Sequence, residues 1–516
     1  MEQIKPNSNR FRDRFLLEIV VFVCGALVMI YEIVGSRILA PYIGTSTYVW
    51  TSLIGVILAS LSLGYWLGGK MADRKPEIKV LSNVMFIAAA LMSVTILLHA
   101  FVLSLISQIS LGLEIKSILA AVLLFAPASV LLGFVTPYAV RLKMNSVENA
   151  GKTVGRLYAL STIGSILGTF LAGFFLLPFI GSVRTLYLLA GILFLLWIAL
   201  APFRLDTTNL FVLLLFFCGV SANEFFAHQL SRNDEFISFD TEYSRVQILR
   251  GNDKKTGKPI RSLTLDPLST QSAIFLDSDE LVLNYGKYYH LLRYFKPDFR
   301  ETLIIGGAGY SFPRDYLRKY PDAKIDVVEI DPQMTEIARQ YFRLEDHPNL
   351  GIFHEDGRVF LNRVNANQYD VMLIDAFGSL FSIPFQLTTI EAVRKMNDGL
   401  KNDGIVILNL ISAIEGDASL FLQAEFRTFQ EVFPHVYLFK INPEKPDDAN
   451  QNLIIVACKS DCPPPEAKSA DGKISELLEK FYKKPLNLSV PVLTDDLAPV
   501  EYYNSFAQKS AVQSRE

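Results

Sequence analysis

The residues best suited to chemistry stand at the ends of apolar runs in the second half of the chain. Gly306 and Gly307 follow the run 302–305, and a glycine turn there would let the backbone approach a nucleoside that a side chain would exclude. Glu329 ends the next run, 22 residues beyond Gly307, near the spacing at which an acid binds both ribose hydroxyls. Each signal is weak alone, but together they indicate a nucleoside-binding site.

Two further acids follow later runs of the same kind. Asp356, within Glu355-Asp-Gly357, is placed where an adenine amino group could be bound, and Asp375 ends the run that begins at Asp370. In open α/β sheets, ligands bind outside the carboxyl ends of the strands. One such acid is usually a solvated loop carboxylate, whereas three at successive strand ends favour a binding site.

Alternating strands and helices must position these residues. We expect strands near 302–306, 324–330, 351–354, 370–375 and 404–409, with a helix at 313–319. This alternation is typical of a parallel sheet with crossover helices. A strand-like stretch at 236–265, with a turn at 254–258, precedes it. The predicted order is a small β element in 227–300, then a class I methyltransferase-like (Rossmann-like) α/β domain in 301–516.

The first 226 residues have a different character. Of the 516 residues 51% are hydrophobic and 20% charged, and most long apolar runs precede residue 226. A helix that spans a bilayer needs about 20 apolar residues. Candidate spans are 15–39, 49–67, 81–106, 117–140, 154–180, 186–202 and, more weakly, Leu210–Phe226. We therefore expect a multi-span helical membrane domain in residues 1–226, with the lipid bilayer as its partner.

Basic residues orient these spans. Lys and Arg cluster in the N-terminal tail, the second loop and the fourth loop: Lys5, Arg10, Arg12 and Arg14; Lys70, Arg74, Lys75 and Lys79; Arg141, Lys143, Lys152 and Arg156. Short loops rich in Lys and Arg lie in the cytoplasm. The N-terminus is therefore predicted to be cytoplasmic, and six spans would return the chain to the cytoplasm.

Small and ionisable residues within the spans suggest helix contacts. Gly64 and Gly68, like Gly164 and Gly168, have the spacing that lets two helices approach closely. An ionisable group inside a span, such as Glu32, usually faces the interior of the bundle. It could serve a polar path or only a structural contact between helices, and the sequence leaves both open.

Several classes of protein are unsupported. The net charge of −3 argues against a non-specific nucleic-acid binder. The six histidines and four cysteines show no metal-ligand spacing. Cys458 and Cys462 could pair in an oxidising compartment, but we expect them to be free thiols. The sequence also has no phosphate-binding P-loop and no hydrolase nucleophile elbow.

Residues 236–460 resemble the spermidine synthase (polyamine aminopropyltransferase) family. The resemblance rests on Ser244-Arg-Val-Gln247, Leu265-Asp266, Tyr289-His290, Ile305-Gly-Gly-Ala-Gly309, Val328-Glu-Ile-Asp331, Glu355-Asp-Gly357 and Ile374-Asp375. The first half is similar to a bacterial branch in which such a domain is fused to a multi-span region. Its marks include Gly44-Thr-Ser46, Gly68-Gly-Lys-Met-Ala-Asp-Arg74, Leu157-Tyr-Ala159 and Leu493-Thr-Asp-Asp-Leu-Ala-Pro-Val-Glu501.

The resemblance implies a reaction and a role for each motif residue. The family transfers an aminopropyl group from decarboxylated S-adenosylmethionine to an amine and releases methylthioadenosine, without a metal. By position, the family's catalytic acid is Asp375; the nucleoside-binding residues are Gly306, Gly307, Glu329, Asp356 and Gly357; and the residues at the mouth are Gln247, Tyr289 and His290. The soluble members of the family further imply a homodimer.

Three departures from the family pattern stand out. Gly309 occupies the place of the acid that grips the donor's ammonium, the stretch 375–378 lacks the second acid for a diamine, and the late tyrosine is replaced near 450–452. A dication needs carboxylates or aromatic faces to offset its desolvation. Acids of the C-terminal segment could substitute for the missing ones: Asp495, Asp496 or Glu501.

Three functions therefore stay open from the sequence. The first is an aminopropyltransferase with an unidentified amine acceptor. The second is another reaction of S-adenosylmethionine, either methyl transfer or cleavage to methylthioadenosine. The third is a non-catalytic nucleoside sensor or a regulated transporter, against which the presence of Asp375 argues. Because the co-substrate is a cytoplasmic metabolite, we expect the chain in the bacterial inner membrane with its catalytic domain in the cytoplasm, although a true seventh span would reverse this.

Overall fold

The computed structural model describes residues 8–513 apart from 45, 110, 145–149, 201–209, 211–212, 215, 218–235, 266–269, 378–382 and 466–468. The chain forms two compact units: Met1–Arg232 with Phe239–Arg245, and Asn233–Ser238 with Val246–Glu516. The first is the helical unit and the second the sheet unit. The short segment 239–245, which the sequence assigned to the β element, thus belongs with the helices.

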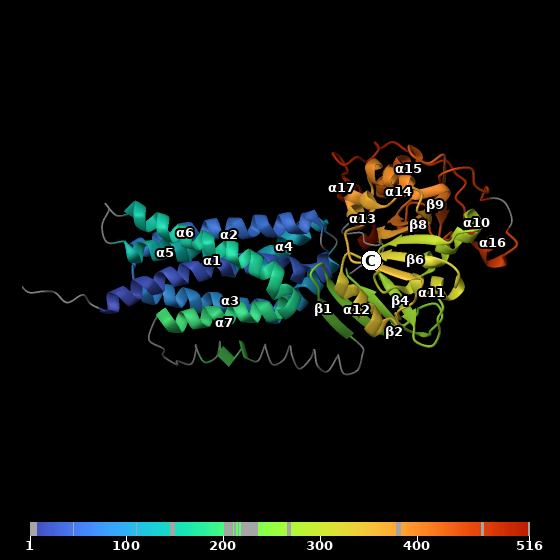
Figure 1. The fold of residues 1–516 in the computed structure, drawn as a ribbon. Helices are drawn as coiled ribbons and strands as arrows, with labels where there is room; N and C mark the ends of the chain where they lie inside the picture. The colour runs from blue at the N-terminus through green and yellow to red at the C-terminus, as the bar shows by residue number, and fades with distance from the viewer. Residues whose placement is uncertain are drawn as a thin grey trace, which may run out of the picture. The chain divides into compact units, whose positions relative to one another are not determined.

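Long apolar helices run side by side in the helical unit (Figure 1). They are α1 (Ser8–Ile43), α2 (Thr47–Arg74), α3 (Ile78–Gln108), α4 (Leu113–Leu124), α5 (Ala126–Lys143), α6 (Ala150–Leu171) and α7 (Ser182–Leu200), and the π-helix η1 (Ala172–Ile180) continues α6. Within the described residues, five helical stretches are long and apolar enough to cross a membrane, and the bent pair α4 and α5 makes a sixth. The expected weak span Leu210–Phe226 lies largely outside the described residues.

Two predicted spans are less regular than expected. The span expected at 117–140 is broken at Phe125, where α4 and α5 meet at 57°. The span expected at 154–180 changes from α-helix to π-helix at Ala172, and Pro178 lies within the π-helical part. Proline and π-helical segments are common causes of helix distortion.

Glycines set the closest helix contacts in this unit. A Cβ on Gly64 would lie 2.1 Å from the carbonyl oxygen of Val130 in α5, and one on Gly164 would lie 2.0 Å from that of Phe22 in α1. Gly68 and Gly168 are equally blocked by neighbouring backbone. The predicted role of both glycine pairs is confirmed, since only residues without a side chain allow these backbones to touch.

An antiparallel β element begins the sheet unit, although the end of its first strand (239–240) and the first residue of its second strand (Arg245) belong to the helical unit. Its strands are β1 (Phe236–Asp240), β2 (Arg245–Asn252), β3 (Pro259–Thr264) and β4 (Ser272–Phe275), paired in that order. Three short helical segments follow, α9 (Asn284–Tyr288), η2 (Tyr289–Leu291) and α10 (Leu292–Phe295). The β element predicted from residue 236 onward is therefore present.

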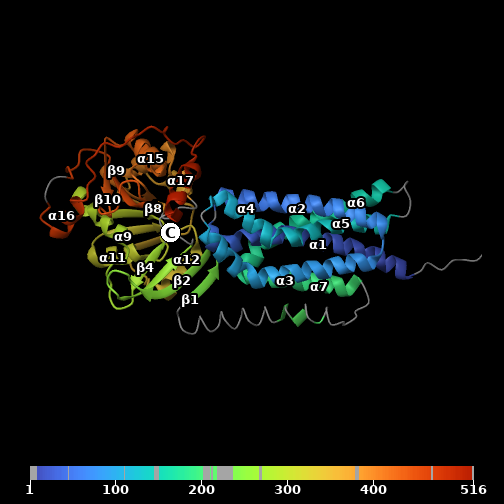
Figure 2. The ribbon, with the colours of Figure 1, turned by 180° about the vertical axis from the view of Figure 1, so that it is seen from behind.

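The main sheet of this unit has seven strands, in the order β10-β11-β9-β8-β5-β6-β7. They are β5 (Glu301–Ile305), β6 (Lys324–Val328), β7 (Leu350–Phe353), β8 (Tyr369–Phe377), β9 (Leu400–Ser412), β10 (His435–Lys440) and β11 (Gln451–Cys458). Strands β8, β9 and β10 are labelled in Figure 2. The five strands expected from the sequence are the parallel ones. Two antiparallel strands, β10 and β11, extend one edge and were not predicted.

Helices connect and cover these strands. They are α11 (Ser311–Lys319), α12 (Pro332–Tyr341), α13 (Gly357–Arg363), α14 (Ile390–Gly399), α15 (Leu420–Gln430), α16 (Gly472–Leu478) and α17 (Val500–Gln513). A continuous apolar core joins β8, β9 and β11 to α14 and α15, with Met372, Leu408 and Phe429 fully buried in it. This core holds the strand ends of the candidate site in fixed positions.

The expectation of free thiols at the end of β11 is wrong. Cys458 and Cys462 form a disulfide, with their Cα atoms 6.4 Å apart. The sequence could not show this, because pairing at a separation of four residues depends on how the chain turns after β11.

Candidate active site

The predicted site residues lie on four strands that are neighbours in the sheet. The order β8-β5-β6-β7 brings the carboxyl ends of these strands to one edge. Asp375 lies in β8, the glycine turn follows β5, Glu329 follows β6, and Asp356 lies three residues beyond β7. Residues as far apart in sequence as Gly306 and Asp375 thus share one edge of the sheet.

The glycine turn after β5 is tightly packed against neighbouring parts of the chain. Gly306 has φ of +102°, a conformation that favours glycine, and a Cβ there would lie 2.6 Å from the carbonyl oxygen of Asp375. Gly307 presses against the ring of Tyr310, with a Cβ position 2.8 Å from that ring. The turn therefore tolerates no side chain at either position.

Glu329 holds the glycine turn from the neighbouring strand. Its Oε2 accepts hydrogen bonds from the amides of Gly307 (2.9 Å) and Ala308 (2.8 Å), and its Oε1 accepts one from the amide of Asp331 (3.1 Å). Burial raises the pKa of this carboxyl, and the three amides oppose that rise. The carboxylate is thus fixed beside the turn.

Asp356 begins helix α13. Its Oδ1 accepts hydrogen bonds from the amides of Arg358 (2.8 Å) and Val359 (3.1 Å), as an N-cap residue does. Gly357 lets the helix start close to the sheet, because a Cβ there would lie 2.6 Å from Ile305. The predicted adenine-binding acid is therefore held at a helix start that packs on the end of β5.

Asp375 lies at a bulge in β8. Ile374 pairs with Leu408 and Phe377 with Leu410, so three steps along β8 oppose two along β9. Bulges of this kind reorient side chains and are frequent next to active sites. Here the bulge falls between Ile374 and Phe377, in the stretch that contains Asp375.

The surroundings of Asp375 favour proton transfer near neutral pH. Burial raises its pKa to about 7, although Tyr289, Asn409 and Tyr285 act to lower it by hydrogen bonding. The hydrogen bond of clear geometry comes from Nδ2 of Asn409, at 3.1 Å. The Tyr289 hydroxyl is buried without a well-aligned partner among the described residues, and the Tyr285 hydroxyl donates to the carbonyl of Gln271 at 3.1 Å. A carboxyl with a pKa near 7 can both accept and release a proton at physiological pH.

The side-chain amide of Asn452 binds the side chain of Asn409 on the side away from Asp375. The side-chain oxygen of Asn409, which is fully buried, accepts a hydrogen bond from Nδ2 of Asn452 at 3.1 Å. The two asparagines lie diagonally across the β9–β11 ladder, since Asn409 pairs with Ile454. Asp375, Asn409 and Asn452 thus form one chain of hydrogen bonds.

Gly309 leaves no space for a side chain. A Cβ there would lie 2.6 Å from Oγ of Ser272 and 3.1 Å from the ring of Phe342. The Ser272 hydroxyl is held in turn by Ser311, at 2.7 Å. The packing around the turn therefore leaves no room for an acidic side chain at position 309.

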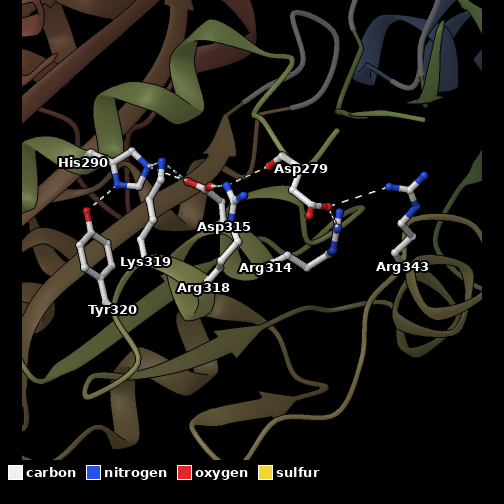
Figure 3. A network of polar contacts seen from close by, with 8 residues as sticks. All are labelled: Asp279, His290, Arg314, Asp315, Arg318, Lys319, Tyr320 and Arg343. Atoms are coloured by element: carbon white, nitrogen blue, oxygen red, sulfur yellow. Dashed lines mark hydrogen bonds and ion pairs between the residues drawn. The ribbon is translucent and has the colours of Figure 1, made fainter. Parts of the chain in front are cut away.

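His290 lies in a network of charged residues (Figure 3). Its Nδ1 lies 2.6 Å from the hydroxyl of Tyr320 and its Nε2 lies 2.8 Å from Oδ2 of Asp315. Burial alone would raise the pKa of Asp315, but hydrogen bonds from His290, Lys319 and Arg318 hold it well below its ordinary value. Burial also lowers the pKa of His290. The adjacent Tyr289 acts to lower the pKa of Asp375, whereas the side chain of His290 belongs to this network.

The remaining sequence candidates lie in other surroundings. Gln247 lies on β2, paired with Thr264. Asp495 forms an ion pair with Arg358 (2.7 Å) and accepts a hydrogen bond from the Thr389 hydroxyl (2.6 Å), whereas Asp496 is exposed.

Glu501 lies in the first turn of α17. The described residues contain no group of three or more His, Cys, Asp or Glu side chains that could hold a metal ion.

Sequence reasoning missed three features of this site. The bulge at Asp375 and the closure of Gly309 by Ser272 have no local signal, because they depend on strands distant in sequence. The contact to Asn409 had one, since this polar residue ends an otherwise apolar run, Gly404-Ile-Val-Ile-Leu-Asn409.

Comparison with protein families places a known domain over this site. Residues 286–442 match the spermine/spermidine synthase domain model. This range includes β5 to β9, the glycine turn, Glu329, Asp356 and Asp375.

Individual relatives match the same half of the chain. A polyamine aminopropyltransferase of Vibrio vulnificus is 31% identical over 190 residues, which are 36% of this chain and 60% of that relative. One from Streptococcus uberis is 29% identical over 238 residues, which are 44% of this chain and 81% of the relative. The chain thus spans about three fifths of the first of these relatives. Among solved structures, spermidine synthase from Thermotoga maritima has a TM-score of 0.35 and 21% identity, over 44% of this chain and 73% of that one.

Proposed function

We propose, from the match of residues 286–442 to the spermine/spermidine synthase domain model, that this chain is a membrane-anchored aminopropyltransferase. Its co-substrate would be decarboxylated S-adenosylmethionine, its acceptor a small amine, and its nucleoside product methylthioadenosine. The observation that carries the proposal is the position of the Asp375 carboxyl, which lies beside the glycine turn at the edge of the sheet and accepts a hydrogen bond from Asn409 at 3.1 Å. Burial there raises its pKa to about 7.

The reaction needs a proton acceptor at this place. An ammonium has no free electron pair, so the acceptor amine must lose a proton before it attacks the carbon next to the sulfonium. The new C–N bond forms as the C–S bond breaks, and the electrons of that bond stay on sulfur as methylthioadenosine leaves. Asp375 in its carboxylate form would accept the amine proton, and Tyr289 would help to enclose the reacting groups.

The nucleoside would lie across the ends of β5, β6 and β7. Glu329 would bind the ribose hydroxyls and Asp356 the adenine amino group, with Gly306 and Gly307 beneath. Three amides already occupy the Glu329 carboxylate, which offers about four acceptor positions. Ribose would therefore add one hydrogen bond directly and displace an amide for a second.

Gly309 gives specific support to a second function. Ser272 blocks the space that the side chain of an acid at position 309 would need. A donor that still carries its own carboxylate, S-adenosylmethionine, has less need of such an acid. The alternative is therefore methyl transfer from S-adenosylmethionine, or its cleavage to methylthioadenosine.

Product identification separates these reactions. Purified full-length chain in detergent would be incubated with either donor, with and without putrescine, and the nucleoside identified by mass spectrometry. Methylthioadenosine that appears only with decarboxylated donor and amine supports the proposal. Methylthioadenosine from S-adenosylmethionine alone indicates cleavage, and S-adenosylhomocysteine indicates methyl transfer.

A matched pair of variants links the product to the site. Asp375→Asn should abolish turnover and keep nucleoside binding. Asp322→Asn removes an exposed carboxylate at a surface turn and should change neither. Tight nucleoside binding without any product from the unsubstituted chain would contradict the enzyme proposal and favour a sensor.

A further inference from the structure

One end of the helical bundle gathers basic residues from helices α5 and α6. Glu18 in α1 forms ion pairs with Lys143 at the end of α5 and with Arg156 in α6, the latter at 2.8 Å. Arg141 pairs with Asp73 near the end of α2 at 3.3 Å. These basic residues belong to the loops that the positive-inside rule places in the cytoplasm. This end of the bundle is the basic end.

Helix α7 finishes at the basic end. The hydroxyl of Ser82 donates to the carbonyl of Trp197, at 3.1 Å. Ser82 lies in the first two turns of α3, just after the basic loop that carries Lys75 and Lys79, and Trp197 lies in the last turn of α7. The described part of α7 therefore ends, at Leu200, on the cytoplasmic side.

The segment 239–245 packs against the opposite end. The Asp240 carboxylate accepts hydrogen bonds from the amide of Ser182 (3.0 Å) and from its hydroxyl, at the first residue of α7. The guanidinium of Arg37 donates to the carbonyl of Glu242. Nineteen residues separate Arg37 from Glu18 in the continuous helix α1, so the two contacts lie about 28 Å apart along the helix. That distance is about the thickness of the hydrocarbon core of a bilayer.

We propose that the sheet unit lies on the non-cytoplasmic side of the membrane. Leu200 is at the basic end of the bundle, whereas Asp240 is at the other end. The sheet unit continues directly from residue 245 and must start on the side where that residue lies. This placement is the reverse of the one expected from the cytoplasmic location of the co-substrate.

The disulfide supports the same placement independently. Cys458 and Cys462 are joined within the sheet unit. Disulfides persist in oxidising compartments outside the cytoplasm, whereas cytoplasmic thiols are kept reduced. In the cytoplasm these two cysteines would be kept as reduced thiols.

The placement has a consequence for the order of reactions, which rests on the proposed function. A sulfonium nucleoside and a polyamine are both charged and do not cross a bilayer unaided. A transport step must therefore supply the nucleoside donor to this site, and the acceptor would be an amine present outside the cytoplasm.

Cysteine labelling tests the placement without any measurement of turnover. In a full-length chain with Cys24→Ala and Cys218→Ala, one variant would carry Lys255→Cys in the exposed β2–β3 turn. A matched control would carry Lys75→Cys in the exposed loop between α2 and α3. Intact spheroplasts of a Gram-negative host would be treated with a membrane-impermeant maleimide, before or after permeabilisation.

We expect the cysteine at 255 to react in intact spheroplasts and the cysteine at 75 to react only after permeabilisation. Protection of 255 until permeabilisation would overturn the proposal. Thiol trapping of the unsubstituted chain gives a second readout: Cys458 and Cys462 should be oxidised in growing cells and reduced in cells that lack the periplasmic thiol oxidase. A pair that is reduced in normal cells would count against the placement. Because neither readout uses catalysis, failure of the proposed reaction would be seen separately.

Discussion

Nδ2 of Asn409 lies 3.1 Å from Oδ1 of Asp375, at the point where β8 bulges against β9. Asn452 fixes the orientation of the same amide from β11. The amide of Asn409 can therefore only donate toward Asp375, which stabilises its carboxylate form. The antiparallel edge of the sheet, which carries no predicted site residue, thus contributes to the acid at its centre.

Turnover should depend on pH through Asp375. Its folded-state pKa is about 7 and the carboxylate is the form that accepts a proton, so activity should fall as the pH drops below about 7. Asp375→Asn should lower turnover by at least about 100-fold. Because the native pKa is raised, ionisation of this acid opposes folding, so stability should fall as the pH rises from about 4 to 7. The variant should lose that dependence, which thermal unfolding at a series of pH values would show.

Asn409→Ala should shift the pH profile rather than only reduce activity. Removal of its hydrogen bond takes away a contact that lowers the pKa of Asp375, so the acidic limb should move to higher pH. Asn452→Ala should produce a smaller shift of the same sign, because it acts through Asn409. A profile of unchanged shape in both variants would contradict the positioning role. A kinetic titration of kcat from pH 5 to 9 measures this.

An acid restored at position 309 should require a second change. Gly309→Asp alone places a Cβ against Ser272 and should destabilise the sheet unit by about 1–3 kcal/mol. Adding Ser272→Gly removes Oγ and Cβ of Ser272, the two nearest blocking atoms, and should recover most of that loss, because only the Phe342 ring at 3.1 Å then remains in contact. If the missing acid limits donor binding, the double variant should bind decarboxylated S-adenosylmethionine more tightly than the unsubstituted chain. Calorimetric titration and chemical unfolding would measure the two effects.

Asp495 and Asp496 should behave differently. Asp495→Ala breaks the ion pair with Arg358 and the bond from Thr389, which brace the helix that Asp356 begins. We expect a loss of about 1 kcal/mol, seen as an approximately fivefold weaker nucleoside affinity. Asp496→Ala, at an exposed neighbour, should leave affinity unchanged. Abolished turnover with unchanged nucleoside binding in Asp495→Ala would instead indicate that this carboxylate serves the amine.

Glu425 should be a source of instability at neutral pH. It is fully buried in α15, and neither carboxyl oxygen has a hydrogen-bond partner among the described residues. Burial raises its pKa well above the ordinary value, so the native state retains a proton that the unfolded state releases. Stability should therefore decrease as the pH rises above about 4.5, and Glu425→Gln should be more stable at pH 8 by about 1–3 kcal/mol. Equal stability of both chains at pH 8 would contradict this.

The parallel part of the sheet could be predicted because its buried strands are continuous apolar runs that end in glycine or acid residues. Glu329 and Asp375 were located from such runs, and both lie at strand ends in the structure. The edge strands β10 and β11 were not predicted, because short apolar runs do not reveal strand direction or pairing. Contacts that join distant strands, such as Ser272 with Gly309 or Asn452 with Asn409, depend on register. A single sequence does not contain that information.

The close approach of Gly306 to Asp375 couples the position of the turn, where we propose that the donor binds, to the position of the carboxyl that we propose accepts the proton. The Cβ position of Gly306 is 2.6 Å from the carbonyl oxygen of Asp375, so even an alanine would push the β8 bulge outward. A displacement that begins at the nucleoside would likewise reach the acid directly, without any intervening side chain. The binding of the nucleoside and the orientation of the proton acceptor therefore depend on each other in this domain. A substitution designed to alter one of them should be tested for its effect on both.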